Sequence, residues 1–288
     1  MRFGLQLPSY GPVAGPEAIA AAATRAEQLG FDSLWTSDHV LVPSRIARFA
    51  TIYEAMTTLV WAAAHTERIR LGPSVVILPQ RDPVLAAKQL AMVDVLSGGR
   101  LIAGLGAGYV EEEFAFLGAR YAGRGATLER HLEVMRALWA GETDYAGESA
   151  SFADARFGPL PVQGERIPIW LGGNSAPALR RAARIADAWH PGYLGAEALA
   201  AKVGELRELA GERRVEVAIK LRVSTGPGDD LSPDAPAPDV GGTPAQVRDQ
   251  LRRYEEAGAD HAVVVFPVET RAAFERELES FAAEAMPA

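Results

Sequence analysis

The sequence has no cysteine among its 288 residues. This absence excludes disulfide bonds, thiolate metal ligands, iron–sulfur clusters and a cysteine nucleophile. The chain also lacks a His-Glu-x-x-His pattern or any other spacing of metal ligands, and it lacks a Gly-x-Ser-x-Gly elbow. We therefore expect no metal site and no serine nucleophile of the hydrolase type.

Long apolar runs and an excess of basic residues are absent as well. No stretch of about 18 apolar residues occurs, so no membrane-spanning helix is expected. Met1–Leu7 runs directly into a strand-like segment and lacks the apolar region and cleavage site of a signal peptide. The net charge is −8, and no basic stripe is present to bind nucleic-acid phosphates. We expect a cytoplasmic protein that binds neither membranes nor nucleic acids.

Short apolar segments alternate with longer helical ones in a chain that is 48% hydrophobic and 23% charged. The strand-like segments are Arg2–Leu7, Ser33–Thr36, Arg68–Leu78, Arg100–Leu105, Ile167–Leu171, Ala188–His190, Val215–Val223 and His261–Phe266. The helical segments are Pro16–Leu29, Thr51–His65, Asp82–Leu96, Leu128–Trp139, Ser175–Ala186, Ala196–Ala210, Thr243–Ala257 and Arg271–Ala285. Eight such βα units predict an α/β fold, a single (β/α)8 TIM barrel over residues 1–288. An open doubly wound sheet is the alternative.

Two polar segments rich in glycine and proline exceed the usual length of a connection. They are Thr143–Gly164 and Thr225–Gly242, and we interpret them as loop insertions that act as lids or mobile loops. Together with the Tyr10–Gly15 and Val40–Ala50 loops, they are expected to form the substrate pocket.

In a barrel of this type, the active site lies at the C-terminal ends of the strands. Asp38 and His39 follow the second predicted strand. A histidine there can donate or accept a proton near neutral pH, and the adjacent aspartate can orient it or cap the next element. The alternative is a solvated turn pair without a catalytic role.

Glycine-rich segments follow three other strands. Gly72-Pro73 indicates a bulge before Ser74 and Val75, unless it is only a twisted edge. Gly106 and Gly108 allow a flat ligand or a phosphate to approach the backbone closely. The segment Gly172-Gly173-Asn174-Ser175 precedes a helix and is the best candidate for an anion site, the alternative being an ordinary N-cap.

Charged residues outside these loops receive plainer interpretations. Glu111, Glu112 and Glu113 form a run that is typical of a solvated helix start. His65, His131, His190 and His261 are scattered along the chain. Arg100 follows a helix C-cap and is expected to pair with carboxylates at the base of the barrel.

These pieces together resemble the luciferase-like monooxygenase superfamily, especially its branch of F420-dependent oxidoreductases. The resemblance covers nearly the whole chain, and the matching pieces occur in family order. They are Phe3–Leu5, Ala26–Trp35, Ser37–His39, Thr66–Leu71, Ser74–Pro79, Ala87–Gln89 with Asp94, Ser97–Arg100, Gly104–Tyr109, Glu113-Phe114, Pro159–Gln163, Pro168–Ser175, Asp187–Trp189 and Gly242–Pro244.

The resemblance implies an isoalloxazine-like ring at the strand C-termini. It implies that His39 lies beside the reactive carbon of the deazaflavin and that Asp38 touches the cofactor. It further implies a non-prolyl cis peptide at Ser74-Val75 behind the ring, and a phosphate tail held by Gly172–Ser175. A homodimer is also expected on this basis.

One position departs from the pattern. Sugar-phosphate dehydrogenases of this group carry a catalytic carboxylate directly after the glycine loop, where this chain has Tyr109. The resemblance thus favours hydride transfer between coenzyme F420 and a small organic substrate other than a sugar phosphate. The alternatives are an FMN-dependent monooxygenase of the same fold and a non-catalytic flavin-binding protein.

Overall fold

Parallel strands form one large sheet in the computed structural model, which describes residues 1–226, 231 and 238–286. The order of the strands around this sheet is β3-β2-β1-β12-β10-β9-β8-β5-β4. Their bounds are β1 (Arg2–Gln6), β2 (Ser33–Thr36), β3 (Arg70–Pro73), β4 (Val76–Ile77), β5 (Ala103–Gly106), β8 (Ile169–Gly172), β9 (Ala188–His190), β10 (Glu216–Ser224) and β12 (His261–Val265). A short strand, β11 (Val240–Gly241), pairs with β10.

The third strand of the barrel consists of two pieces, β3 and β4. The β3 piece pairs with β2, and the β4 piece pairs with β5. A parallel bridge between Leu71 and Leu101 joins β3 to the residues just before β5. The ring of strands is thereby closed, and the predicted (β/α)8 barrel is confirmed.

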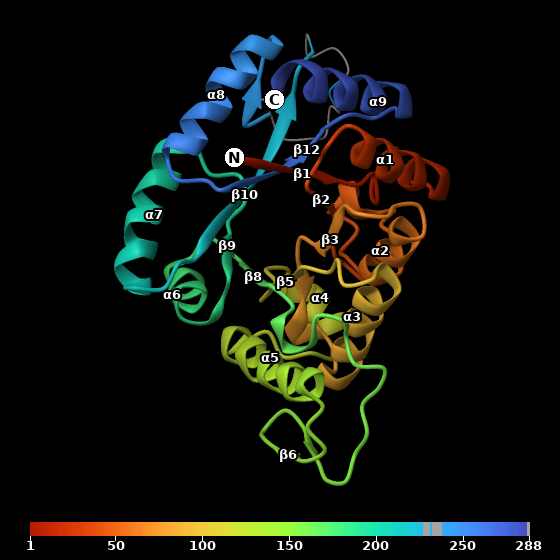
Figure 1. Cartoon of the computed structure of the whole chain (residues 1–288), viewed down its shortest axis with the longest axis vertical. Coiled ribbons are helices and arrows are strands. Elements are labelled where there is room, and N and C mark those ends of the chain that lie inside the picture. Colours follow the sequence, from red (N-terminus) through yellow and green to blue (C-terminus); the bar gives the residue numbers. More distant parts are fainter. Residues whose placement is uncertain (227–230, 232–237, 287–288) are drawn as a thin grey trace.

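Helices surround the sheet, as Figure 1 shows. Their bounds are α1 (Pro16–Gln28), α2 (Ala55–Ala63), α3 (Pro83–Ser97), α4 (Glu111–Phe116), α5 (Arg124–Ala140), α6 (Ala176–Ile185), α7 (Ala196–Ala210), α8 (Pro244–Glu256) and α9 (Arg271–Ser280). Four short helical turns are η1 (Ala47–Phe49), η2 (Leu78–Gln80), η3 (Gly164–Arg166) and η4 (Phe281–Ala285). Most helices match the predicted segments within a few residues. Helix α5 begins at Arg124, before the predicted Leu128. Gly123, in the left-handed conformation, is its N-cap, and Gly125 lies within its first turn.

Local chemistry accounts for several helix starts. Asp82 accepts a hydrogen bond from the Leu85 amide at the start of α3. Thr243 and Gln246 form a capping box at the start of α8. Each cap satisfies backbone N–H groups that have no partner within the helix. A proline occupies the first turn of α3 and of α8, where its missing N–H costs nothing.

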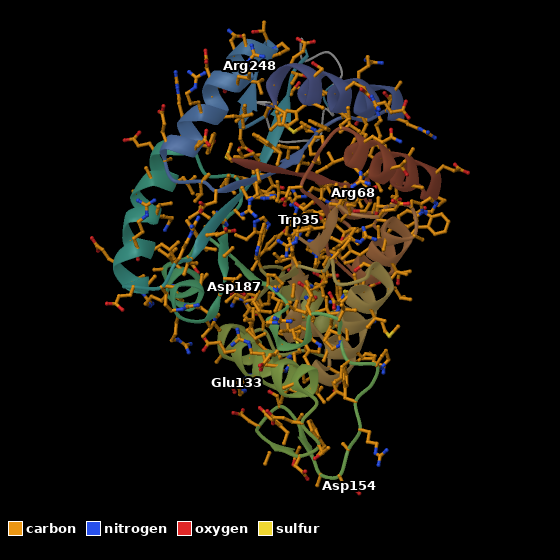
Figure 2. All side chains as sticks on the ribbon, in the orientation of Figure 1. Trp35, Arg68, Glu133, Asp154, Asp187 and Arg248 are labelled. Atoms are coloured by element: carbon orange, nitrogen blue, oxygen red, sulfur yellow. The ribbon has the colours of Figure 1, made fainter. Side chains whose placement is uncertain are left out.

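The interior of the barrel contains a small aromatic core. Trp35 stacks on Trp170 with ring centroids 4.6 Å apart, and Ile102, Ala188, Ala218 and Val263 complete the cluster. Trp35 lies toward the middle of the molecule in Figure 2. A Cβ atom on Gly72 would come within 2.5 Å of the Trp35 ring, so glycine in β3 makes room for this tryptophan.

Arg100 does not pair with carboxylates at the base of the barrel, and that prediction is wrong. Its guanidinium donates to the backbone carbonyls of Ala63, Thr66, Ile69 and Ser97 and to the Thr66 hydroxyl. Five donors in a fixed fork suit a loop that presents several unpaired carbonyls. The residue therefore fastens the end of α2 and the loop before β3 to the C-terminal end of α3.

The Thr143–Gly164 insertion lies away from the C-terminal ends of the strands. It follows α5 and precedes β8, so it belongs to the opposite, N-terminal end of the barrel. Its strands β6 (Tyr145–Ala146) and β7 (Ser151–Phe152) form a hairpin beyond α5 (Figure 1). The interpretation of this insertion as a lid on the substrate pocket is wrong. Residues 227–230 and 232–237 of the other insertion lie outside the described residues.

A matched pair of glycine substitutions tests the packing between β3 and β5. A Cβ on Gly104 would overlap the Pro73 carbonyl, whereas Gly204 in α7 has open space around it. We expect Gly104→Ala to lower the free energy of unfolding by about 2–3 kcal/mol or more. Gly204→Ala is expected to raise it by about 0.5–1 kcal/mol through helix propensity. Urea denaturation of both variants checks this, and equal stabilities would contradict the packing described.

Candidate active site

A cavity of about 1240 Å³ opens at the C-terminal ends of the barrel strands. Residues after most of the strands line it, so its position is the one that the fold favours for an active site. Every site residue predicted from the sequence lines this cavity: Asp38, His39, Ser74, Val75, Gly106, Gly108, Gly172, Gly173, Asn174 and Ser175. Their shared location is a structural fact, whereas their roles remain predictions.

A buried carboxylate holds His39 in place. The His39 Nδ1 lies 2.7 Å from Glu113 Oε2, and the Val40 amide donates to Glu113 Oε1 at 2.7 Å. Burial raises the pKa of Glu113, but these hydrogen bonds outweigh it and leave the pKa below the usual value. The carboxylate therefore fixes a proton on Nδ1. Among the described residues, the other ring nitrogen of His39, Nε2, has no hydrogen-bond partner.

The interpretation of Glu111–Glu113 as a solvated run is wrong for its last member. Glu113 is 0% exposed, while Glu111 and Glu112 face the solvent. All three belong to the first turn of α4, and only the third points toward the barrel. The adjacent Phe114, also fully buried, was the available signal that the inward face of this short helix begins here.

Asp38 stabilises the second piece of the broken strand. Its Oδ2 accepts from the Ile77 amide and its Oδ1 from Arg81, both at 2.8 Å. Burial raises the pKa of Asp38, and the Arg81 charge partly offsets that effect. Both carboxylate oxygens thus already have protein partners, although the residue lines the cavity. A contact between Asp38 and a cofactor stays a prediction.

The strand break itself matches the expectation from the family resemblance. The Ser74-Val75 peptide bond is cis. The Ser74 hydroxyl lies 2.8 Å from His190 Nε2, and His190 Nδ1 lies 2.5 Å from the Ala218 carbonyl. Because a carbonyl can only accept, Nδ1 carries the proton, and Nε2 accepts from Ser74. Burial lowers the pKa of His190 to about 4, so this imidazole is neutral near pH 7.

Two glycines of neighbouring strands make room for the Val75 side chain. A Cβ on Gly106 would overlap a methyl group of Val75, and a Cβ on Gly172 would lie 3.1 Å from the other methyl group. The sequence predicted that Gly106 would admit a ligand to the backbone. The structure shows that Gly106 first of all admits Val75, which itself lines the cavity.

Lys220 is a site residue that the sequence reasoning missed. Its Nζ donates to Gln6 Oε1 at 2.9 Å and to the Ser74 carbonyl at 3.3 Å, with 7% of the residue exposed. Burial lowers its pKa to about 7. The available signal was a single lysine within the apolar run Val215–Val223, because a charge in such a strand must meet polar partners.

The Gly172–Ser175 segment lies at the start of α6 and lines the cavity. Ser175 caps α6 as an ordinary N-cap, and Asn174 exchanges two hydrogen bonds with the Gly192 backbone of the loop after β9. Arg124, at the start of α5, also lines the cavity. It donates to the Gly108 carbonyl, stacks on Tyr121, and has no carboxylate partner among the described residues. A helix N-terminus together with an unpaired guanidinium suits an anionic group.

The sequence matches the family model of the luciferase-like monooxygenases over residues 1–232. The chain belongs to this family. A putative coenzyme F420-dependent oxidoreductase of Mycobacterium tuberculosis is 30% identical over 204 residues, which is 66% of this chain and 55% of that protein. An F420-dependent glucose-6-phosphate dehydrogenase of Intrasporangium calvum is 28% identical over 95% of each chain.

Solved structures support the same fold. The coenzyme F420-dependent tetrahydromethanopterin reductase of Methanopyrus kandleri superposes with a TM-score of 0.80 and 22% identity, over 98% of this chain and 97% of that one. The chain spans about two thirds or less of the length of the first curated relatives that it matches, from 66% down to 52%.

Two features are absent from the described part of the chain. Within residues 1–226, 231 and 238–286, no group of three or more His, Asp and Glu side chains is placed to hold a metal ion. In the same residues, no helix has both the length and the apolar character that a membrane crossing requires.

The pH dependence of stability tests the burial of Lys220. Between its native pKa of about 7 and its usual value of 10.5, the unfolded chain binds more protons than the native state. The contribution of Lys220 to the free energy of unfolding therefore rises with pH across this window and is lowest below pH 7. We expect the free energy of unfolding of wild type, minus that of Lys220→Met, to become more positive from pH 7 to pH 10 in urea denaturation. Lys202→Met, on α7, serves as the control, and parallel curves for wild type and Lys220→Met would contradict the assignment.

Proposed function

We propose that this protein is an F420-dependent oxidoreductase that transfers a hydride between coenzyme F420 and a small organic substrate. The observation that carries the proposal is the His39–Glu113 pair, whose imidazole lines the same cavity as the Val75 bulge and the glycine segments. An imidazole oriented by a buried carboxylate, with its other ring nitrogen facing the cavity, is the arrangement that general acid–base catalysis requires. Coenzyme F420, when bound, supplies two-electron hydride chemistry comparable to that of a nicotinamide.

The cavity residues fit such a coenzyme. The cavity volume of about 1240 Å³ exceeds the 300–1,000 Å³ of common small-molecule sites, so it has room for a cofactor and a substrate together. Val75, backed by Gly106 and Gly172, is proposed to support the ring. Arg124 and the α6 N-terminus are proposed to hold the anionic tail. Asp38, Ser74, Gly108 and Gly173–Ser175 complete the proposed cofactor site.

His39 has a defined task in this proposal. Reduction of a carbonyl group requires a proton in addition to the hydride, and the reverse reaction must remove that proton. Glu113 keeps the Nδ1 proton in place, so Nε2 is the atom that gives or takes a proton on the substrate. Glu113 is a positioning residue in this scheme, because it acts through His39.

The names of the relatives support coenzyme F420 as the cofactor, and FMN remains the alternative within the family. The homodimer and the cytoplasmic location expected from the sequence stay predictions. A sugar phosphate is not favoured as the substrate, because Tyr109 stands where the family pattern of such enzymes has a carboxylate.

Turnover measurements with matched glutamate variants test the proposal. Candidate alcohols and ketones are screened with oxidised and reduced F420, with the absorbance of the coenzyme as the readout. Once a substrate is found, we expect Glu113→Gln to lower kcat by about 10- to 100-fold, and His39→Ala to lower it by about 100-fold or more. Both variants should keep F420 affinity within about threefold, because neither residue is proposed to hold the coenzyme tail.

Glu112→Gln is the control, since Glu112 lies one residue earlier on α4, pairs with Arg45 at the surface and does not line the cavity. It should leave kcat unchanged. A wild-type protein that binds F420 tightly, with no turnover in the screen, would support the non-catalytic binding protein instead. Equal kcat values for wild type and His39→Ala would refute the assigned role of His39.

A further inference from the structure

A second polar cluster lines the cavity beside His39. It consists of Tyr10, Arg48, Phe49 and Tyr109, here named the Arg48 cluster. The Phe49 ring lies 4.4 Å from the His39 ring and 5.1 Å from the Tyr10 ring, measured between centroids. The Tyr109 ring meets His39 edge-on at 5.9 Å. The proposed proton donor therefore lies in an aromatic recess.

The loops that carry this cluster are joined by backbone hydrogen bonds. Gly11 N donates to the Thr51 carbonyl at 2.9 Å, and Tyr53 N donates to the Ser9 carbonyl at 2.8 Å. An antiparallel bridge links Tyr10 with Ile52. These two loops thus hold Tyr10, Arg48 and Phe49 in place before any ligand binds, which reduces the ordering cost of binding.

Arg48 lacks a carboxylate partner, unlike two of the other three arginines that line the cavity. Arg222 pairs with Asp239 at 2.7 Å, and Arg181 pairs with Glu129 at 2.9 Å. Among the described residues, Arg48 has one hydrogen bond, to the Tyr109 hydroxyl at 3.3 Å, and its guanidinium lies 4.8 Å from the centre of the Phe49 ring. Its positive charge is therefore available to a ligand in the cavity.

The cluster offers neutral donors beside that charge. Burial raises the pKa of Tyr10, so its phenol stays protonated near neutral pH and can donate. One guanidinium with neighbouring phenols matches a planar monoanion, since the guanidinium fork binds a carboxylate through two parallel hydrogen bonds. A phosphate dianion favours a further unpaired guanidinium or a helix N-terminus. Arg222 and Arg181 are already paired with carboxylates, so among the described cavity residues Arg124 and the α6 N-terminus meet this need.

We propose that the substrate is an aromatic or similarly flat carboxylic acid, whose carboxylate binds Arg48 and Tyr109 and whose body packs on Phe49 beside His39. This inference deepens the proposed function and rests on it, since the bound acid is a substrate only if the protein catalyses the proposed hydride transfer. The cavity thereby has two anion sites. Arg124 serves the tail of the coenzyme, and Arg48 serves the substrate.

Calorimetric titration with matched pairs of ligands tests this assignment. The probes are benzoate with benzamide, 2-naphthoate with 2-naphthamide, and octanoate with octanamide, each titrated into the protein with and without F420. We expect each carboxylate to bind about 10- to 100-fold more tightly than its amide, as a charge-assisted hydrogen-bonded pair predicts. The aromatic acids should bind more tightly than octanoate, and phenyl phosphate should bind no better than benzoate when F420 is bound.

Variants identify the residue responsible. Arg48→Met should abolish the preference for the acid, Arg48→Lys should keep part of it, and Arg45→Met, on the same loop but outside the cavity lining, should keep all of it. Arg124→Met should lower the affinity for F420 and leave the acid preference of the F420-free protein intact. If no pair shows a preference for the acid, or if Arg48→Met leaves it unchanged, the inference is overturned. With F420 bound, so that the proposed tail site at Arg124 is filled, tighter binding of phenyl phosphate than of benzoate would overturn the carboxylate class.

The same titrations separate this inference from the proposed function. A protein that fails to bind F420 but shows an Arg48-dependent preference for acids would contradict the cofactor and retain the acid site. A protein that binds F420 without such a preference would retain the cofactor and contradict the acid site.

Discussion

The interruption of the third barrel strand between Pro73 and Val76 is the constraint on which the rest of the site depends. It exposes backbone groups that a continuous strand would pair within the sheet, and buried polar groups must find partners. Asp38 accepts a hydrogen bond from the Ile77 amide, and Lys220 donates one to the Ser74 carbonyl. The interruption also turns Val75 toward the cavity, against two glycines. Aspartate, lysine and glycine at these positions thus follow from one local departure from strand geometry.

On another side of the cavity, the arrangement depends on the hydrogen bond that holds the His39 imidazole. Glu113 is fully buried, and its two oxygens are used by His39 and by the Val40 amide. A carboxylate is thus present near the proposed proton donor, although Tyr109 stands where the resemblance places a catalytic carboxylate in sugar-phosphate dehydrogenases. Glu113 contacts Nδ1 and therefore orients the His39 ring. With Arg48 over the Phe49 ring, the proposed substrate side of the cavity combines the proposed proton donor, an aromatic wall and a positive charge.

The barrel was predictable from the sequence, because eight apolar segments recur with the βα period, and Ala196–Ala210 even has the predicted bounds. The location of the site was predictable too, since strand C-termini converge. Residues whose role depends on a distant partner were not. In the sequence, Glu113 resembles a surface charge, because only the fold shows that the third residue of α4 points inward. The role of Lys220 depends on Gln6, a partner that lies far away in the sequence. The Thr143–Gly164 insertion was misplaced because its length suggested a lid, whereas its position after a helix assigns it to the other end of the barrel.

Fluorescence titration of the purified protein with oxidised F420, and separately with FMN, shows whether the cavity is an F420 site. We expect micromolar or tighter binding of F420 and much weaker binding of FMN, with the affinity for F420 falling when salt screens the charge of Arg124. The reverse preference would contradict the claim and favour the flavin monooxygenase, and failure to bind either molecule would remove the cofactor assignment altogether.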